Sequence, residues 1–515
     1  MAEAPEGARR RRRGRAGDRA PGVEQRPWRL PRQRFPPLAG VGEEALERIH
    51  QASLEILEEI GIDILEPEAR QILKAGGADV AADGERVRFD RGLVEATLGK
   101  APEVVRLHAR NPAHSFDLGG GTIAFCAVAS APNCSDLEGG RRTGNRTDYQ
   151  NLLRLAQALN TIHVIGGYPV EPVDLHPGIR HLDALADIVR LTDKVFHAYS
   201  LGRERIADAL EIVRIARGID AATLAREPSL FSIINASSPL RFDAPMLRGV
   251  IDLARAGQVV VVTPFTLAGA MAPVTLAGAL AQQNAEALAG LVLTQLVKPG
   301  APFVYGGFTS NVDMKSGAPA FGTPEYMNAV LVGGQLARRY RVPYRTSNVN
   351  AANTVDAQAA YESVFSLWAT TMAGGDLIKH AAGWLEGGLC ASFEKMVLDA
   401  DLLQMVSAFL DPIEVSDGTL ALDAVREVGP GGHYFGAAHT QARYRDAFYA
   451  PLISDWRNHE SWLEAGAPDA FHHASRLVKL LLEAYQPPPL DPAIDEALEA
   501  FIMRRKREGG VPTDF

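Results

Sequence analysis

Eight short apolar segments along the middle of the chain constrain the fold more than any other feature of this sequence. Each is typical of a buried strand, and their starts lie about 36 residues apart on average, the size of one strand–helix unit. Helical patterns separate them, as in residues 203–218 and 275–300. Strands that alternate with helices form a parallel sheet, so the sequence predicts an α/β fold, a (β/α)8 TIM barrel. The segments are Thr122–Ala129, Ile162–Tyr168, Val195–Ser200, Leu230–Asn235, Val259–Thr263, Phe303–Gly307, Tyr344–Asn348 and Leu377–His380.

A doubly wound open sheet is the alternative to the barrel. That fold is associated with a glycine-rich G-x-G-x-x-G turn after a strand, and this sequence has none. We therefore divide the chain into a disordered basic and proline-rich arm (1–40), an α+β lead segment (41–118), the barrel (119–409) and an extension of loops and helices packed on the barrel (410–515).

The composition excludes several classes of protein. The formal charge is −9 over 515 residues, which argues against nucleic acid as the main partner. No uninterrupted apolar run reaches roughly 18 residues, so no membrane span is expected. Three cysteines are too few for a disulfide framework, which favours a reducing, cytoplasmic location. The arginine-rich start, Arg9–Arg13, is expected to be a solvated arm, with nucleic-acid or acidic-partner binding as the alternative.

Candidate binding residues follow the strands, because TIM barrels carry their active sites at the strands' C-terminal ends. The set combines aromatic rings with amides and a few carboxylates. Rings and diffuse negative charge select a quaternary ammonium, which has no proton to donate to a hydrogen bond. We also expect a turn of the C-terminal extension to fold back over the barrel mouth. The substrate-binding candidates are Phe308, Asp313, Asn348, His380, Trp384 and Glu386, with His433 and Tyr434 from that turn.

Common catalytic motifs are missing from the sequence. It contains no H-E-x-x-H, no C-x-x-C and no G-x-S-x-G, so neither a metal site nor a serine nucleophile is predicted. Asp313 and Glu386 could form an acid–base pair, but their separation does not follow from sequence. The catalytic residues therefore remain unassigned at this stage.

Four ordered segments carry a resemblance to a known family: Tyr305–Tyr326, Asn353–Ser363, Gly429–Thr440 and Leu481–Ile502. Together they resemble the trimethylamine methyltransferase family, and the likeness extends from about residue 41 onward. The resemblance implies a barrel enzyme that moves a methyl group from a methylated amine to the Co(I) corrinoid (cobalamin) of a separate protein. Asp174-Leu175-His176 is followed by Pro-Gly-Ile, which does not continue as a corrinoid-binding pattern. We therefore expect no cofactor bound in the chain itself and a corrinoid protein as partner.

The sequence departs from the family in one respect. The family's archaeal trimethylamine enzymes use pyrrolysine, which we would expect near residues 345–353, whereas this chain has only standard residues. A quaternary amine needs no such activation, because a neutral tertiary amine leaves. The resemblance therefore favours betaines, such as glycine betaine, proline betaine or carnitine. Lys315, Arg345 or His433 would then bind the betaine carboxylate.

Two other functions stay open on sequence alone. A non-catalytic binder would hold a quaternary amine in the same pocket without transferring a methyl group. A TIM-barrel lyase would act on an unrelated substrate. We also expect a homo-oligomer, whose size and final methyl acceptor the sequence does not give.

Overall fold

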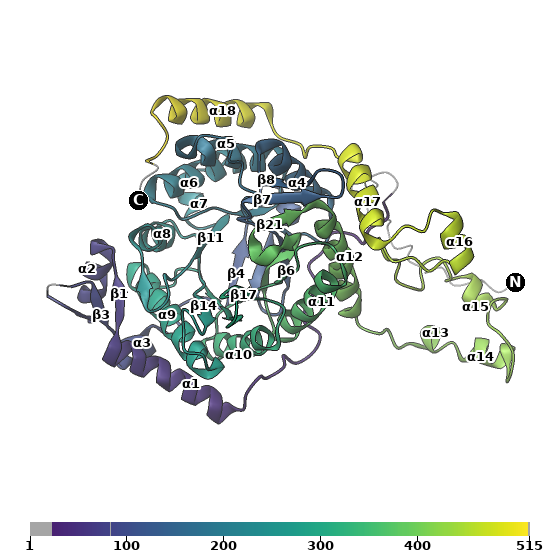
Figure 1. The fold of residues 1–515 in the computed structure, drawn as a ribbon, viewed down its shortest axis with the longest axis horizontal. Helices are drawn as coiled ribbons and strands as arrows, with labels where there is room; N and C mark the ends of the chain where they lie inside the picture. The colour runs from purple at the N-terminus through teal and green to yellow at the C-terminus, as the bar shows by residue number, and fades with distance from the viewer. Residues whose placement is uncertain (1–22, 83, 513–515) are drawn as a thin grey trace, which may run out of the picture.

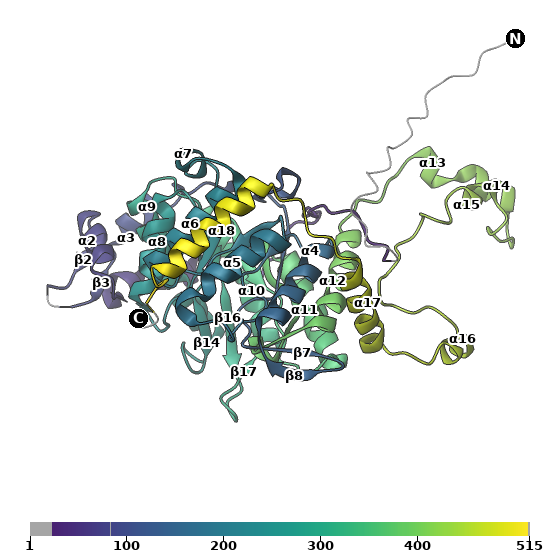
Figure 2. The same ribbon diagram turned by 90° about the horizontal axis from the view of Figure 1, so that it is seen from above.

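A closed barrel of eight parallel strands forms the centre of the computed structural model, which describes residues 23–82 and 84–512 (Figures 1 and 2). Each strand overlaps one of the eight predicted segments, so the TIM-barrel prediction is confirmed. In chain order the barrel strands are β6 (Ala124–Ala127), β9 (Val164–Ile165), β10 (Val195–His197), β11 (Leu230–Ile234), β13 (Val259–Val262), β15 (Phe303–Gly306), β18 (Tyr344–Ser347) and β19 (Leu377–Ala382).

Helices form an outer ring around the strands (Figure 1). α9 has no solvent-facing polar side over residues 279–295, because it is buried between the barrel and the N-terminal segment. α6 ends at Gly218, whose φ of 63° is the left-handed conformation that closes a helix at little cost for glycine. The ring contains α4 (Arg146–Ala158), α5 (Pro177–Leu191), α6 (Arg203–Arg217), α8 (Ala244–Arg255), α9 (Leu276–Val297), α10 (Pro324–Tyr340), α11 (Ala357–Met372) and α12 (Phe393–Phe409).

The segment before the barrel covers one side of it and closes its N-terminal end. β1 pairs in parallel with β12 (Arg241–Phe242), and α1 and α3 pack on α9. The β4–β5 hairpin buries Val105, Leu107, Phe116 and Leu118 against side chains of the barrel strands. These elements are α1 (Glu43–Glu55), a π-helical turn (Ile56–Ile60), β1 (Ile62–Ile64), α2 (Pro67–Ala75), β2 (Asp79–Val80), β3 (Arg86–Arg88), α3 (Arg91–Thr97), β4 (Val104–Leu107) and β5 (Phe116–Gly119).

Short sheets rise from the opposite, C-terminal end of the barrel and frame its mouth (Figure 2). One is formed by β14 (Phe265–Ala268), β16 (Phe308–Val312) and β17 (Pro319–Ala320). The other is formed by β7 (Asn133–Asp136), β8 (Gly140–Thr143), β20 (Trp384–Leu385) and β21 (Cys390–Ser392). The strand–loop units that follow β6, β13, β15 and β19 are therefore structured, and they hold the side chains at the mouth in place.

The chain after α12 leaves the barrel and then returns to it. α13 (Asp417–Leu420), α14 (Leu422–Val428), α15 (Ala438–Gln441) and α16 (His459–Glu464) lie on a segment that extends away from the barrel (Figures 1 and 2). α17 (Ala470–Ala484) packs on α12, and α18 (Pro492–Arg507) packs on α5 and α6. No helix in residues 23–82 or 84–512 has both the length and the apolar character needed to cross a bilayer.

The expectation of a disordered arm does not hold for residues 23–40. Gln25 donates a hydrogen bond to the carbonyl of Ala158, and the backbone of Leu38 bonds that of Met372. This stretch therefore lies across the barrel in specific contact with it. The arginine-rich part of the predicted arm, within residues 1–22, lies outside the described residues.

A buried ion pair joins α11, α12 and the loop after β19. The Lys395 ammonium lies 2.5 Å from the Asp399 carboxylate, and both side chains are fully buried. Ser363 and the backbone of Gly383 also donate to that carboxylate. Burial lowers the pKa of Lys395 and raises that of Asp399, while their mutual attraction opposes both shifts. The pair holds Gly383, and with it the adjacent Trp384, at the wall of the barrel mouth.

Lys395→Met should lower the free energy of unfolding by about 3–5 kcal/mol, because it leaves the Asp399 charge buried without its counter-ion. Urea denaturation at pH 7 measures this change. Lys479→Met, which removes an exposed lysine paired with Glu138, is the matched control and should leave the midpoint unchanged. Equal, small effects of the two variants would contradict a structural role for the buried pair.

Candidate active site

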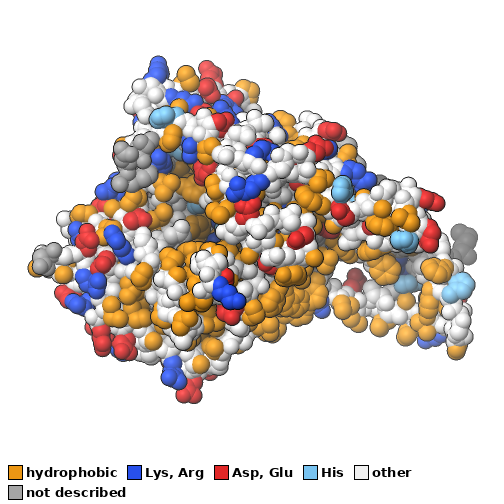
Figure 3. Space-filling model, in the orientation of Figure 1, with side chains coloured by type: hydrophobic (Ala, Val, Ile, Leu, Met, Phe, Trp, Pro, Cys, Tyr) orange, Lys and Arg blue, Asp and Glu red, His pale blue; other side chains and the backbone are white. Residues whose placement is uncertain are grey.

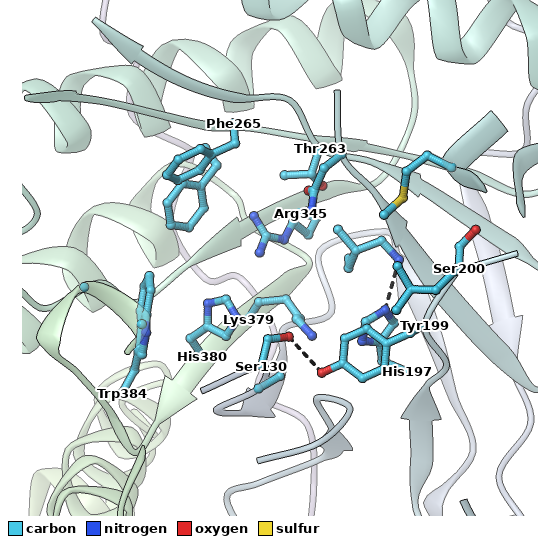
Figure 4. A pocket seen from close by; sticks show the side chains of 18 of the residues that line it. Ser130, His197, Tyr199, Ser200, Thr263, Phe265, Arg345, Lys379, His380 and Trp384 are labelled. Carbon is cyan, nitrogen blue, oxygen red and sulfur yellow. Dashed lines mark hydrogen bonds between the residues drawn. The ribbon is translucent and has the colours of Figure 1, made fainter. Parts of the chain in front are cut away.

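A cavity of about 250 Å³ opens at the C-terminal ends of the barrel strands (Figure 4). Its walls come from the ends of several strands and from the loops and short strands after β6, β10, β13, β15 and β19. Ser130 and Leu201 are exposed at its rim, so the cavity reaches the surface. This is where TIM-barrel enzymes place their chemistry, which makes the cavity the candidate active site.

Aromatic rings form one wall of the cavity. Phe308 lies at the centre of this wall, with its ring centroid 5.1 Å from that of Phe265, 5.6 Å from Phe321 and 5.9 Å from Trp384. Tyr199 stands across the cavity, where its hydroxyl lies 2.8 Å from the Ser130 hydroxyl (Figure 4). Such a wall suits an apolar group or a cation attracted by ring faces.

Arg345 brings a positive charge to the same cavity from β18. Its side chain is buried, and its Nε and Nη1 have no hydrogen-bond partner among residues 23–82 and 84–512. The guanidinium carbon lies 5.5 Å from the centroid of the Phe308 ring. Burial lowers the pKa of Arg345 to about 10, so the group stays charged at neutral pH. A buried, unpaired guanidinium is costly, and its usual explanation is a ligand that pairs with it.

Lys379 is a second basic group in the cavity, contributed by β19. Its ammonium donates to the carbonyl of Gly166 at 2.5 Å and lies 5.9 Å from the Phe231 ring centroid. Burial, together with the positive charge of nearby Arg345, lowers the pKa of Lys379 to about 7. Lys379 therefore changes its charge near neutral pH.

Two histidines of the cavity are neutral. His197 donates from Nδ1 to the carbonyl of Gly166 at 3.0 Å and accepts at Nε2 from the backbone of Ile233. His380 has a φ of 53°, and it lies where the pairing of β19 with β6 loses its register. A bulge of this kind redirects a side chain, and here the His380 ring contacts the Trp384 ring at 4.5 Å. Burial places the pKa of both imidazoles well below the usual 6.5.

No carboxylate lines this cavity in the described part of the chain, so its fixed charge is positive. The described residues also contain no cluster of three histidine, cysteine or acidic side chains able to hold a metal ion. The arrangement combines an aromatic wall with an unpaired buried guanidinium. It therefore suits a ligand that has both an anionic group and an apolar or cationic body.

Three of the eight predicted binding residues line the cavity: Phe308, His380 and Trp384. Asn348 lies behind the wall, where its amide is bonded to Ser363 and Ser366 of α11, so its role is to join β18 to that helix. The same amide also donates to the carbonyl of Ala381, and Asn348 does not line the cavity.

The other four predicted residues are not brought to the cavity. Asp313 lies in an exposed turn between β16 and β17, where its carboxylate accepts from Ser316 and from the backbone of Lys315. Glu386 is held at the rim by Arg141 at 2.9 Å. His433 and Tyr434 are exposed on the segment that leaves the barrel, so the expected fold-back over the mouth is not seen.

Several cavity residues were missed by the sequence reasoning. Phe265 and Tyr199 follow strands β13 and β10, so their position in the chain was an available signal. Lys379 and Arg345 carried another signal, because each is a charged residue inside an apolar strand segment. Of these residues, Arg345 alone is predicted from the sequence, as one of three possible ligands of a carboxylate.

Arg345→Met should raise the free energy of unfolding by about 1–3 kcal/mol, because it replaces an unpaired buried charge with an apolar side chain. Arg217 is the matched control: it is also mostly buried, but it is bonded to Ser229 at 2.8 Å and to Glu227. Arg217→Met should lower the stability instead. Urea denaturation of both variants measures the difference, and a loss of stability in Arg345→Met would make Arg345 a structural residue.

Comparison with known proteins gives consistent matches over most of the chain. Residues 7–510 match the family described as Trimethylamine methyltransferase (MTTB). The glycine betaine methyltransferase of Desulfitobacterium hafniense strain Y51 is 36% identical over 91% of this chain and 97% of that protein. The trimethylamine methyltransferase MttB of Desulfitobacterium hafniense strain DSM 10664 / DCB-2 is 33% identical over 92% of this chain and 95% of its own length. The crystal structure of the Methanosarcina barkeri monomethylamine methyltransferase MtmB aligns with 87% of this chain and 95% of its own, at 10% identity and a TM-score of 0.44. With a family match over nearly the whole chain, this protein belongs to the trimethylamine methyltransferase family and is a methyltransferase.

Proposed function

We propose that this enzyme takes a methyl group from a betaine, a quaternary amine that carries a carboxylate, and transfers it to the corrinoid of a partner protein. The observation that carries this proposal is the unpaired Arg345 guanidinium, buried beside an aromatic wall. A betaine has one group for each of these features. The likeness to a protein named glycine betaine methyltransferase supports the same substrate class.

The carboxylate end of a betaine would bind Arg345. Nε and Nη1 have no partner among the described residues, and a guanidinium can donate two parallel hydrogen bonds to one carboxylate along either its Nε/Nη2 or its Nη1/Nη2 edge, which an ammonium cannot. The Thr263 hydroxyl also lines the cavity, is buried and has no partner among the described residues. Together these groups would satisfy both carboxylate oxygens.

The trimethylammonium end would face the aromatic wall around Phe308 and Trp384. Ring faces attract a quaternary cation that cannot form hydrogen bonds. A methylated amine without a carboxylate would leave Arg345 unpaired and would meet its repulsion, because no acidic side chain of the described residues lines the cavity. The charge of the cavity therefore disfavours trimethylamine and choline.

The reaction makes modest demands on the chain. A Co(I) corrinoid bound at the mouth would supply the nucleophile that receives the methyl group. As the carbon–nitrogen bond breaks, its electron pair stays on nitrogen, so a neutral tertiary amine leaves and no general acid is required. The residues of the cavity would orient the carbon–nitrogen bond toward the mouth and exclude water. The exposed rim at Ser130 and Leu201 leaves an approach from outside.

The corrinoid would arrive with its own protein. The only candidate signal for corrinoid binding in the sequence was Asp174-Leu175-His176, and His176 instead caps α5 by accepting from the backbone of Gly178 at 3.2 Å. Co(I) also requires reducing surroundings. The three cysteines are unpaired and buried, which fits a cytoplasmic enzyme.

Methyl transfer from a panel of amines tests the proposal. Purified enzyme is mixed with its corrinoid protein reduced to Co(I), and loss of the Co(I) absorbance is followed. Glycine betaine or another betaine should react. Choline, which lacks the carboxylate, and dimethylglycine, which lacks the quaternary nitrogen, should react at least about tenfold more slowly, since each loses one recognition element.

The same assay also compares an Arg345 variant of the enzyme with a control variant. Arg345→Gln should raise KM for the betaine about 10- to 100-fold, the loss expected for one charged hydrogen-bonding partner. Arg341→Gln, which alters an exposed arginine paired with Glu103 near the other end of the barrel, should leave KM unchanged. Equal rates with betaine and choline would refute recognition through the carboxylate, and no reaction with any amine would favour the binder or the lyase.

Betaine binding should weaken as the pH rises from 6 to 8.5. Lys379 has a pKa of about 7 and loses its positive charge over this range, whereas Arg345 stays protonated and the two histidines stay neutral. If the carboxylate raises the Lys379 pKa by about one unit, Kd rises about five- to tenfold. Calorimetric titration measures this change. Lys379→Met should abolish the pH dependence, and its persistence would assign the effect to another group.

A further inference from the structure

α11 has an unusually apolar outer face for a helix that covers a barrel. Its outer face carries Tyr361, Val364, Phe365 and Trp368, which are 60%, 51%, 45% and 46% exposed. Their spacing of i, i+3, i+4 and i+7 forms one continuous stripe. The buried residues of the helix include polar side chains such as Ser363, which donates to Asp399, as well as apolar ones such as Leu367. A helix with its apolar stripe turned outward is typical of a helix that packs against another protein.

The stripe continues onto the neighbouring helix α12. The Trp368 ring lies 5.4 Å from that of Phe409, and Met405 is exposed on the same helix. Figure 3 shows hydrophobic surface on this side of the barrel, beside the gap between the barrel and the extended segment. We call this surface, Tyr361, Val364, Phe365, Trp368, Met405 and Phe409, the side patch.

The segment that begins directly after the side patch is also exposed. From here on, the arm means residues 411–448 and not the N-terminal residues 1–40. Its first residue is held by Arg26 and Arg29, and the chain after it is held by Asp401, which accepts from Tyr449 and Leu452. Both ends of the arm are therefore anchored beside α12, while its middle projects from the barrel (Figure 1).

The arm has no hydrophobic core of its own. Only Ala424 and Ala437 are buried within it, whereas Phe435 and Phe448 are 82% and 88% exposed. Helices as short as α13, α14 and α15 are marginal in water without tertiary packing. The Gly429–Thr440 segment, which the sequence singled out, lies on this arm. Its side chains need a surface to cover them, and the chain's own barrel does not provide one.

We propose that two copies of this chain associate side by side, with their side patches facing across a two-fold axis and each arm lying over the other copy. The arm begins at the edge of the side patch, so it must pass over whatever covers that patch. When the cover is a second copy, the relation is reciprocal, and a single interface buries both patches and both arms.

A second copy fits this surface better than the corrinoid protein does. Methyl transfer brings the corrinoid to the barrel mouth, which the β16–β17 hairpin marks, whereas α13–α15 extend toward the opposite end (Figure 2). A carrier that binds and leaves also uses a polar, transient interface. The side patch and arm instead expose large aromatic and aliphatic side chains, which are typical of a permanent one.

Sedimentation velocity of the full chain at micromolar concentration tests the proposal without depending on the reaction. The subunit mass is 55.5 kDa, so the wild type should sediment at about 111 kDa (2 × 55.5) or an even multiple. The double variant Phe365→Glu, Trp368→Glu should sediment at half the wild-type mass or less. Met503→Glu is the matched control, because Met503 is 47% exposed but lies on α18. It should keep the wild-type mass.

Hydrogen exchange gives a second readout that does not require the charged variant to stay in solution. Amides of residues 417–441 should exchange at least about tenfold faster when the wild type is diluted until it dissociates, because the arm loses its cover. A wild type that is monomeric at micromolar concentration would overturn the proposal. So would a double variant that keeps the full mass, or an arm that becomes protected only when the corrinoid protein is added.

Discussion

Closure of the parallel sheet between β6 and β19 is the constraint on which the rest of this structure depends. A parallel sheet of eight strands has no free edge only when its first and last strands pair, and here they pair through Leu377 with Ala124 and Ile378 with Phe125. The pairing then loses register before Ala382, and His380 turns into the mouth at that point. The irregularity at the closing seam therefore also shapes the cavity.

The cavity concentrates unfavourable electrostatics at one place. Arg345 and Lys379 come from neighbouring strands, and both are buried without an acidic side chain lining the same cavity in the described residues. The buried ammonium of Lys395, by contrast, is paired with the Asp399 carboxylate. The difference is physically informative, because a fold tolerates an uncompensated buried charge mainly where a ligand compensates it. The proposed betaine carboxylate would be that compensation.

Two surfaces of the molecule are suited to different tasks. The mouth is small, polar at its rim and open to the surface, which suits a substrate and a carrier that come and go. The side patch and the arm are broad and apolar, and they lie away from the mouth. This separation means that a second copy bound at the side patch would leave the cavity accessible in each subunit.

The sequence by itself determined the architecture of this protein. Strand-like runs repeat at the length of one strand–helix unit, and that periodicity is a local property of the chain. It also placed Phe308, His380 and Trp384 near the mouth, because each lies at the end of a predicted strand segment or shortly after it. Tertiary structure alone decided which charges enter the cavity. Arg345 and Lys379 sit inside strands, and the direction of a strand side chain depends on how the barrel closes. Asp313 does not line the cavity, because the Ser316 hydroxyl of its own turn donates a short-range hydrogen bond to its carboxylate. His433 and Tyr434 lie on the arm, which projects from the barrel, and no local pattern in the sequence encodes that course.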